Sequence, residues 1–306
     1  MSVEYLFLAL GLAGLFAGGE ALVRGAVGIA HRLAMPPLLI GLTVVGFGTS
    51  TPELLVSVDA ALRGVPDIAI GNVVGSNIGN ILLIVGIAAL VWPIRVAGAT
   101  LRRDSAVMIA AALALVPLFW LGTLGRPAGG VLLAALAGYL AWAYLQGRGG
   151  AGDGGVAPRP LWQSLVWVAV GLAALMLGAR WLVDASVALA RGFGVSEAFI
   201  GLTIVAIGTS LPELATSLIA AFRRQSEIAI GNIIGSNIFN VLGILGATAL
   251  VAPIPVASRF LGFDLPVMIA ASVLLAGLLL LRPAIGRASG LALLAAYGVY
   301  VWAAQG

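Results

Sequence analysis

Long apolar stretches, each interrupted by a few polar residues, fill nearly all of this 306-residue chain. A helix of about 20 apolar residues crosses a bilayer. On that measure the sequence predicts ten membrane-spanning helices, five on each side of a Gly-, Pro- and polar-rich linker at residues 147–160. The predicted spans are residues 4–31, 37–62, 67–92, 105–122, 127–146, 162–190, 196–222, 226–251, 264–282 and 287–305.

The chain contains an internal duplication. Residues 41–86 return as residues 201–246 with 27 of 46 positions identical and no gap. We therefore divide the chain into two five-helix repeats, residues 1–146 and 161–306. Because each repeat has an odd number of spans, the second repeat must enter the membrane from the opposite side. Inverted repeats of this kind are typical of secondary transporters.

The composition supports an all-α membrane protein and argues against other classes. Hydrophobic residues make up 61% of the chain, charged residues 9%, and the mean hydropathy is +1.12. The pI is near 10.1, but the chain has no Lys and its Arg residues stand singly or in pairs, so we expect no nucleic-acid partner. Cysteine is absent, which excludes disulfides and thiolate metal sites. The first apolar run is too long for a signal peptide and is expected to be a retained span.

The arginines predict an orientation. One set of loops carries ten Arg residues and the opposite set carries four. By the positive-inside rule the richer set is cytoplasmic, which places the 147–160 linker inside and both termini outside. The first and sixth spans also hold opposite charges four residues apart, Glu20 with Arg24 and Arg180 with Asp184, which predicts ion pairs within each helix.

Both copies of the duplicated segment predict a broken helix. In "GFGTSTPEL", Pro52 has no N–H, so the Gly48 carbonyl loses its helical donor. Ser50 or Thr51 can cap the helix that follows. "AIGTSLPEL" repeats the pattern at Pro212, so we expect spans 2 and 7 to be broken. Freed backbone carbonyls at membrane depth are tolerated only where they line a cavity or bind something.

The same polar residues recur in both copies and indicate a shared cation site. Polar groups in hydrocarbon are costly unless they are satisfied. The sets are Thr49, Ser50, Glu53, Asn72, Ser76, Asn77 and Asn80, and Thr209, Ser210, Glu213, Asn232, Ser236, Asn237 and Asn240. Asn77 and Asn237 lie off the main stripe and are expected to tie helices together. The rest offer oxygen ligands without His, Cys or Met, which suits a hard cation such as Ca²⁺.

Two other interpretations remain open at this point. Small and polar residues can hold transmembrane helices together without binding anything. The glutamates could alternatively form a proton relay in a transporter for an organic solute. Two glutamates beside two helix breaks favour the cation site over both.

The paired "GTSxPEL" and "GNxxGSNIxN" motifs resemble those of the cation/calcium antiporter superfamily, most nearly the prokaryotic sodium/calcium exchangers. The resemblance implies exchange of Ca²⁺ for Na⁺ by alternating access, with the first and sixth helices sliding across a four-helix core. It implies that Glu53 and Glu213 are the shared carboxylates. It also implies further ligands, namely hydroxyls of Thr49, Ser50, Ser76, Thr209, Ser210 and Ser236, carbonyls of Gly46 and Ala206, and amide oxygens of Asn80 and Asn240.

One departure from the family pattern affects the choice of coupling ion. Family members commonly have an Asp at one of the last two positions, whereas Asn80 and Asn240 are both amides here. An amide oxygen coordinates a cation but carries no charge, so the site has two negative charges instead of three. A proton-coupled exchanger of Ca²⁺ or another divalent cation is therefore the alternative. In either case we expect a multi-pass transporter of the cell (inner) membrane rather than an enzyme, with no cofactor and with inorganic cations and lipid, but no protein, as partners.

Overall fold

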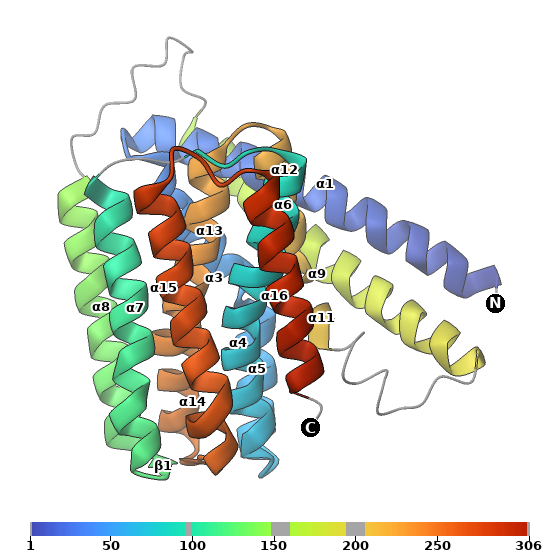
Figure 1. Ribbon diagram of the computed structural model, residues 1–306. Coiled ribbons are helices and arrows are strands. Elements are labelled where there is room, and N and C mark those ends of the chain that lie inside the picture. The colour runs from blue at the N-terminus through green and yellow to red at the C-terminus, as the bar shows by residue number, and fades with distance from the viewer. Residues whose placement is uncertain (1, 96–98, 148–159, 194–205, 305–306) are drawn as a thin grey trace.

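The computed structural model describes residues 2–95, 99–147, 160–193 and 206–304, and it is nearly all helical (Figure 1). In the first half, three breaks or π-helical turns divide the second and third predicted spans into shorter pieces. The elements are α1 (Ser2–Leu33), α2 (Pro37–Ile40), η1 (Gly41–Val45), α3 (Gly46–Thr49), α4 (Thr51–Leu62), α5 (Pro66–Gly79), η2 (Asn80–Ile84), α6 (Val85–Val91), α7 (Ala99–Trp120), β1 (Thr123–Leu124) and α8 (Arg126–Gly147).

The second half repeats much of this order. Its elements are α9 (Leu161–Gly192), α11 (Ala206–Gly208), α12 (Leu211–Phe222), α13 (Ser226–Ile238), η4 (Phe239–Ile244), α14 (Leu245–Val251), β2 (Ile254–Pro255), η5 (Phe260–Asp264), α15 (Leu265–Leu281) and α16 (Arg287–Ala303). Part of the predicted linker and residues 196–205 of the predicted seventh span lie outside the described residues.

Length and composition alone give fewer spans than the ten predicted. Within the described residues, seven helices are long and apolar enough to cross a membrane, and an eighth span results if the bent pair Pro37–Thr49 and Thr51–Leu62 is counted as one. The pair bends by 43°. Helix α12 has 12 residues and α16 has 17, both shorter than the about 20 residues that cross a bilayer without help.

Helices α1 and α9 pack against each other and extend obliquely away from the bundle formed by the other helices (Figure 1). Glycines allow this contact. A Cβ atom added at Gly171 would lie 2.5 Å from the Leu22 nitrogen, and one at Gly178 would lie 2.7 Å from the Leu15 nitrogen. Small residues let transmembrane backbones approach this closely, so the pair forms one smooth unit.

Ion pairs on these two helices differ between the halves. The predicted Glu20–Arg24 pair forms, and Glu20 also accepts hydrogen bonds from Arg223 at the end of α12, one of them at 2.9 Å. The predicted Arg180–Asp184 pair is longer, at 3.7 Å, and both side chains are exposed. A charged contact therefore ties α1 to the bundle at Glu20.

The two halves interlock through their last three spans. Helix α6 packs against α16, and α14 packs against α8. Strand β1 pairs antiparallel with β2, and Ile94 forms an isolated bridge with Ile285, so each link joins a loop of one half to a loop of the other. The halves are therefore repeats in sequence that share one packed core.

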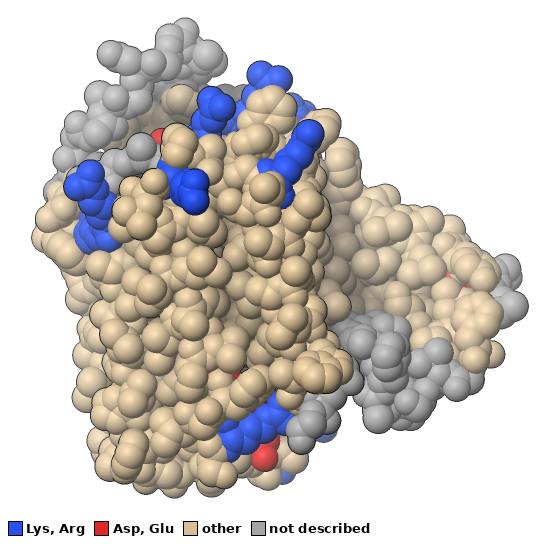
Figure 2. Space-filling view, viewed as in Figure 1, with Lys and Arg blue, Asp and Glu red and all other residues tan. Residues whose placement is uncertain are grey.

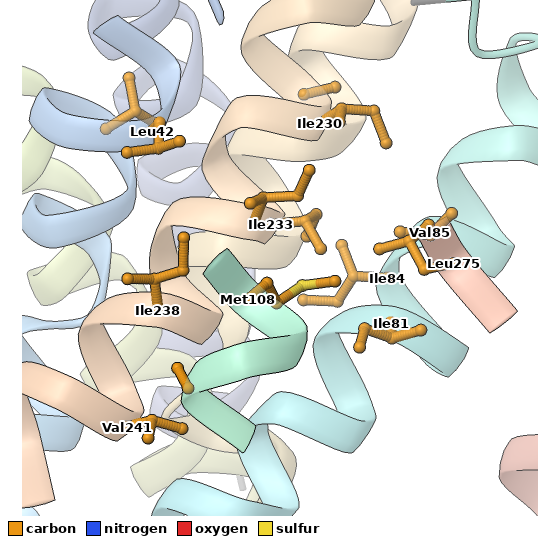
Figure 3. Packing of buried hydrophobic residues seen from close by; sticks show 14 of the residues in the cluster. Leu42, Ile81, Ile84, Val85, Met108, Ile230, Ile233, Ile238, Val241 and Leu275 are labelled. Carbon is orange, nitrogen blue, oxygen red and sulfur yellow. The ribbon is translucent and has the colours of Figure 1, made fainter. Parts of the chain in front are cut away.

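That core surrounds the polar residues with close-packed aliphatic side chains. Figure 3 shows Ile233 of α13, Ile84 of η2 and Met108 of α7 converging between the helices. All three are almost completely buried. Since lipid is as apolar as these side chains, dense packing rather than escape from water holds them in place.

The surface has the charge distribution of a membrane protein. On the face seen in Figure 2, a nearly uncharged band crosses the bundle, with arginines gathered at the end where the α15–α16 connection lies and a smaller charged group at the opposite end. The connections at the first end carry Arg95, Arg282 and Arg287.

Candidate ion-binding site

The second span bends by 43° between Thr49 and Thr51, next to Pro52. Ser50 separates α3 from α4, and Ser210 precedes α12 directly. Each proline occupies the first turn of the helix that follows, where its missing N–H costs little. Glu53 and Glu213 therefore lie in the first turns of α4 and α12, and each is only 1% exposed.

Of the two capping candidates in the first copy, Ser50 and Thr51, Ser50 does not make the capping bond. Ser50 stands at the N-cap position, but neither it nor Ser210 makes a side-chain capping bond. The Ser50 hydroxyl instead donates to Glu213 Oε1 at 2.9 Å, and the Ser210 hydroxyl donates to Glu53 Oε1 at 3.3 Å. Each half thus binds the carboxylate of the other, which brings the two glutamates into one buried cluster.

Asn72 and Asn232 hold the broken segments against the following helices. Asn72 donates to the Glu53 carbonyl at 3.0 Å and to the Ser57 hydroxyl at 2.9 Å. Asn232 makes the equivalent bonds to the Glu213 carbonyl at 3.3 Å and to Ser217 at 2.9 Å. The two amides therefore support the backbone of the site.

Ser57 and Ser217 were not among the predicted site residues, although they contribute to this support. Both are buried, and they occupy equivalent positions in the two copies of the duplicated segment. That identity was a usable signal. It was missed because each serine lies four residues after its glutamate, in a stretch that otherwise reads as apolar helix.

The remaining hydroxyls of the predicted set gather around the same cluster. Ser210 also contacts the Ser76 hydroxyl at 3.3 Å, and the Ser236 hydroxyl donates to the Gly46 carbonyl at 3.1 Å. The Thr49 hydroxyl lies 3.3 Å from the same carbonyl and 3.2 Å from Asn232 Oδ1, so both acceptors are within reach of its single hydrogen.

Ala206 and Thr209, two further predicted ligands, lie just before Ser210 in the second half. Ala206 begins α11, and Thr209 follows its last residue. A pocket lined by Ser76, Ser210 and Tyr297, among others, reaches this side of the cluster.

Two π-helical turns place the last pair of predicted ligands. Asn80 is the first residue of η2, and Asn240 lies within η4. Such turns shift the helical register by one residue and are frequent at functional sites. The Asn80 amide donates to Asn237 Oδ1 at 3.0 Å, and the Asn240 amide donates to Asn77 Oδ1 at 2.9 Å. As expected from the sequence, Asn77 and Asn237 tie the halves together.

Four buried oxygen atoms in this cluster have no hydrogen-bond donor within the described part of the chain. They are Glu53 Oε2, Glu213 Oε2, Asn80 Oδ1 and Asn240 Oδ1. A buried acceptor without a partner costs about 1–3 kcal/mol, and more when it is charged. Hard cations such as Ca²⁺ take carboxylate and amide oxygens together as ligands. The donor set therefore fits Ca²⁺ or Na⁺ as a transported substrate.

Comparison with known proteins identifies the class. The model of the family described as "Sodium/calcium exchanger protein" matches residues 3–145 and 163–305. The chain belongs to this family, and thus to the cation/calcium antiporter superfamily. It is a multi-pass membrane antiporter for inorganic cations including Ca²⁺, and it is not an enzyme.

Individual relatives are similar over nearly the whole chain. The inner membrane protein YrbG of Escherichia coli is 37% identical, covering 100% of this chain and 97% of that protein. The sodium/calcium exchanger MaX1 of Methanosarcina acetivorans is 33% identical, with coverages of 90% and 91%. A solved structure of the sodium-calcium exchanger NCX_Mj superposes with a TM-score of 0.87 at 33% identity, covering 98% of this chain and 99% of that one.

Proposed function

We propose that this protein exchanges Ca²⁺ for Na⁺ by alternating access at one site shared by its two halves. The observation that supports this most is the reciprocal pairing in which Ser50 bonds Glu213 and Ser210 bonds Glu53. Two carboxylates, two amide oxygens and the surrounding hydroxyls supply the number of oxygens that Ca²⁺ requires. The family membership and the likeness to exchangers that are named for sodium and calcium agree with this choice of ions.

The proposal assigns roles to the whole predicted ligand set. Glu53 and Glu213 neutralise the bound cations. Hydroxyl, carbonyl and amide oxygens complete the coordination. These come from Thr49, Ser50, Ser76, Thr209, Ser210, Ser236, Gly46, Ala206, Asn80 and Asn240.

The proposed topology has ten spans arranged as inverted repeats, residues 1–146 and 161–306, with the second and seventh spans broken at Ser50 and Ser210. The bend of 43° at Ser50 and the equivalent placement of Ser210 before α12 support the two breaks. The excess of arginine at one end of the bundle supports a cytoplasmic 147–160 linker and external termini. We place the protein in the cell (inner) membrane, in agreement with the name of the relative YrbG.

A proton-coupled Ca²⁺ exchanger is the second candidate, and the amides at Asn80 and Asn240 favour it. Two carboxylates balance one Ca²⁺, and two protons would neutralise them equally well, which gives an electroneutral exchange. With Na⁺ as the coupling ion, the same site bearing three Na⁺ would carry one positive charge, and transport would move net charge.

Ca²⁺ uptake into vesicles containing the purified protein separates the two candidates. An outward Na⁺ gradient at equal pH on both sides is expected to drive uptake, and Glu53→Gln or Glu213→Gln is expected to abolish it. Uptake that follows a pH gradient and ignores Na⁺ would establish the proton-coupled exchanger instead. Vesicles in which neither gradient drives Ca²⁺ movement would contradict both.

A further inference from the structure

Four asparagines are linked by hydrogen bonds across the two halves, and two of them lie in η2 and η4, which pack against the helices that carry the glutamates. Asn80 donates its amide to Asn237 Oδ1, and Asn240 donates its amide to Asn77 Oδ1. The side-chain amides of Asn77 and Asn237 donate in turn to each other's backbone carbonyls. All four residues are at least 97% buried, since none is more than 3% exposed. The four side chains are therefore shielded from bulk solvent.

The orientation of an asparagine side chain decides whether it can bind a cation. Its oxygen accepts and can coordinate, whereas its NH₂ group only donates and would repel a positive ion. In Asn80 and Asn240 the NH₂ groups are engaged by the opposite half. Their Oδ1 atoms are the buried acceptors that lack a donor among the described residues. Each amide is thus held with its oxygen free.

The orientation of Asn77 and Asn237 is fixed in turn by their other contacts. The Asn77 amide donates to the Asn237 carbonyl at 3.2 Å and contacts Met268 Sδ at 3.5 Å. The Asn237 amide donates to the Asn77 carbonyl at 3.5 Å and contacts Met108 Sδ at 3.7 Å. With their donors directed to these acceptors, only their oxygens remain to meet the amides of the site.

We propose that Asn77 and Asn237 are positioning residues of the ion site, which hold the amides of Asn240 and Asn80 with their oxygens toward the bound cation. This inference rests on the proposed function, because it assumes that Asn80 and Asn240 coordinate the transported ion. It goes beyond a tie between helices, since it makes cation affinity depend on which end of each amide faces the site. Outer partners that orient metal ligands commonly contribute about 10–100-fold to affinity.

A pair of substitutions distinguishes positioning from packing. Asn237→Ala removes the acceptor that holds Asn80. Asn80→Asp replaces the amide with a carboxylate, whose two oxygens can both coordinate, so that no orienting partner is needed. Ca²⁺ binding to the purified protein is measured by titration calorimetry for wild type, both single variants and the double variant. Thr248→Val, which alters a buried hydroxyl without a donor or acceptor among the described residues, is the packing control.

The loss of Ca²⁺ affinity is expected to depend on which residue stands at position 80. Asn237→Ala weakens Ca²⁺ binding by about 10–100-fold when residue 80 is Asn. It changes binding by less than about 3-fold, or strengthens it, when residue 80 is Asp, because Asn237 Oδ1 then faces another acceptor. An equal loss in both backgrounds would overturn the inference and leave Asn237 as a packing residue.

The second half of the network supplies an independent cycle. Asn77→Ala is tested in chains with Asn240 and in chains with Asn240→Asp. Ca²⁺ binding should weaken only when residue 240 is Asn, and an equal loss in both backgrounds would overturn the inference. This cycle replaces the first one if Asn237→Ala does not fold. Glu53→Gln tests the proposed function separately. If wild-type binding survives this change, the shared site itself is wrong and the inference falls with it, whereas equal losses in the two cycles contradict only the inference.

Discussion

The close approach of η1 to α13 allows a quantitative test of how packing holds the site together. A Cβ atom added at Gly235 would lie 2.0 Å from the Leu42 carbonyl oxygen and 2.6 Å from the Leu42 Cα atom. An ordinary contact begins at 3.4 Å, so Gly235→Ala requires the two backbones to separate by about 1.4 Å. The contacting atoms of Leu42 belong to its backbone, so a change of side-chain rotamer cannot relieve the clash.

That separation would reach the site within one residue. Ser236, the next residue, donates to the Gly46 carbonyl at 3.1 Å. An added separation of about 1 Å takes this bond beyond hydrogen-bonding distance. Overpacking costs about 1–3 kcal/mol, and the lost bond about 1 kcal/mol more. We therefore expect Gly235→Ala to lower the free energy of unfolding by about 2–4 kcal/mol and to weaken Ca²⁺ binding at the same time.

The assay is thermal unfolding in detergent together with Ca²⁺ titration of the same preparation. Gly138→Ala is the matched control, because its helix position is exposed and nothing in the described chain lies within 4 Å of its added Cβ atom. It should be neutral or stabilising, since alanine favours helix over glycine by about 0.5–1 kcal/mol. If Gly235→Ala matched this control in both Tm and Ca²⁺ affinity, close backbone packing would not be what holds the site.

Three further predictions, which use four substitutions, test other parts of the structure. Glu20→Gln removes the charge that binds Arg223 and so holds α1 to the end of α12. If α1 must separate from α12 during exchange, the rate of Ca²⁺ uptake rises by up to about fivefold. An unchanged rate would show that this contact does not limit exchange. Asp104→Asn leaves the buried Arg103 side chain without its charged partner at 2.6 Å and should lower the free energy of unfolding by about 3–5 kcal/mol. Asp59→Asn breaks an exposed pair with Arg63 and should lower it by about 1 kcal/mol or less. Similar losses of Tm in the two variants would contradict this difference. Asn240→Asp adds a negative charge and should alter the dependence of Ca²⁺ uptake on membrane potential; identical dependence would remove this residue from the site.

The sequence was informative about elements and less so about contacts. Apolar length predicted the long helices, and Pro52 predicted the break at Ser50, because both depend on local chemistry. The duplication predicted that Glu53 and Glu213 belong to one site. It could not predict that each glutamate is bonded by a serine of the other half, since that depends on how two distant segments pack.

The role of Ser50 shows the same limit in detail. A serine before a helix ordinarily accepts from the first turn, and Ser50 has the right position for this role. In this structure the hydroxyl is turned to the buried Glu213 carboxylate, to which it donates, and it makes no capping bond to the first turn. The π-helical turns at Asn80 and Asn240 were not predicted either, because such turns are rare and a regular α-helix is the default expectation for an apolar span.

Ca²⁺ binding stoichiometry tests the central claim most directly, because a single shared site and two separate sites respond differently to loss of one glutamate. Equilibrium dialysis with radioactive Ca²⁺ is expected to show one ion per wild-type chain, displaced by Na⁺. Glu53→Gln alone and Glu213→Gln alone should each remove that ion entirely. Two ions per chain, with one retained in each single variant, would show that the halves bind independently and would contradict the account.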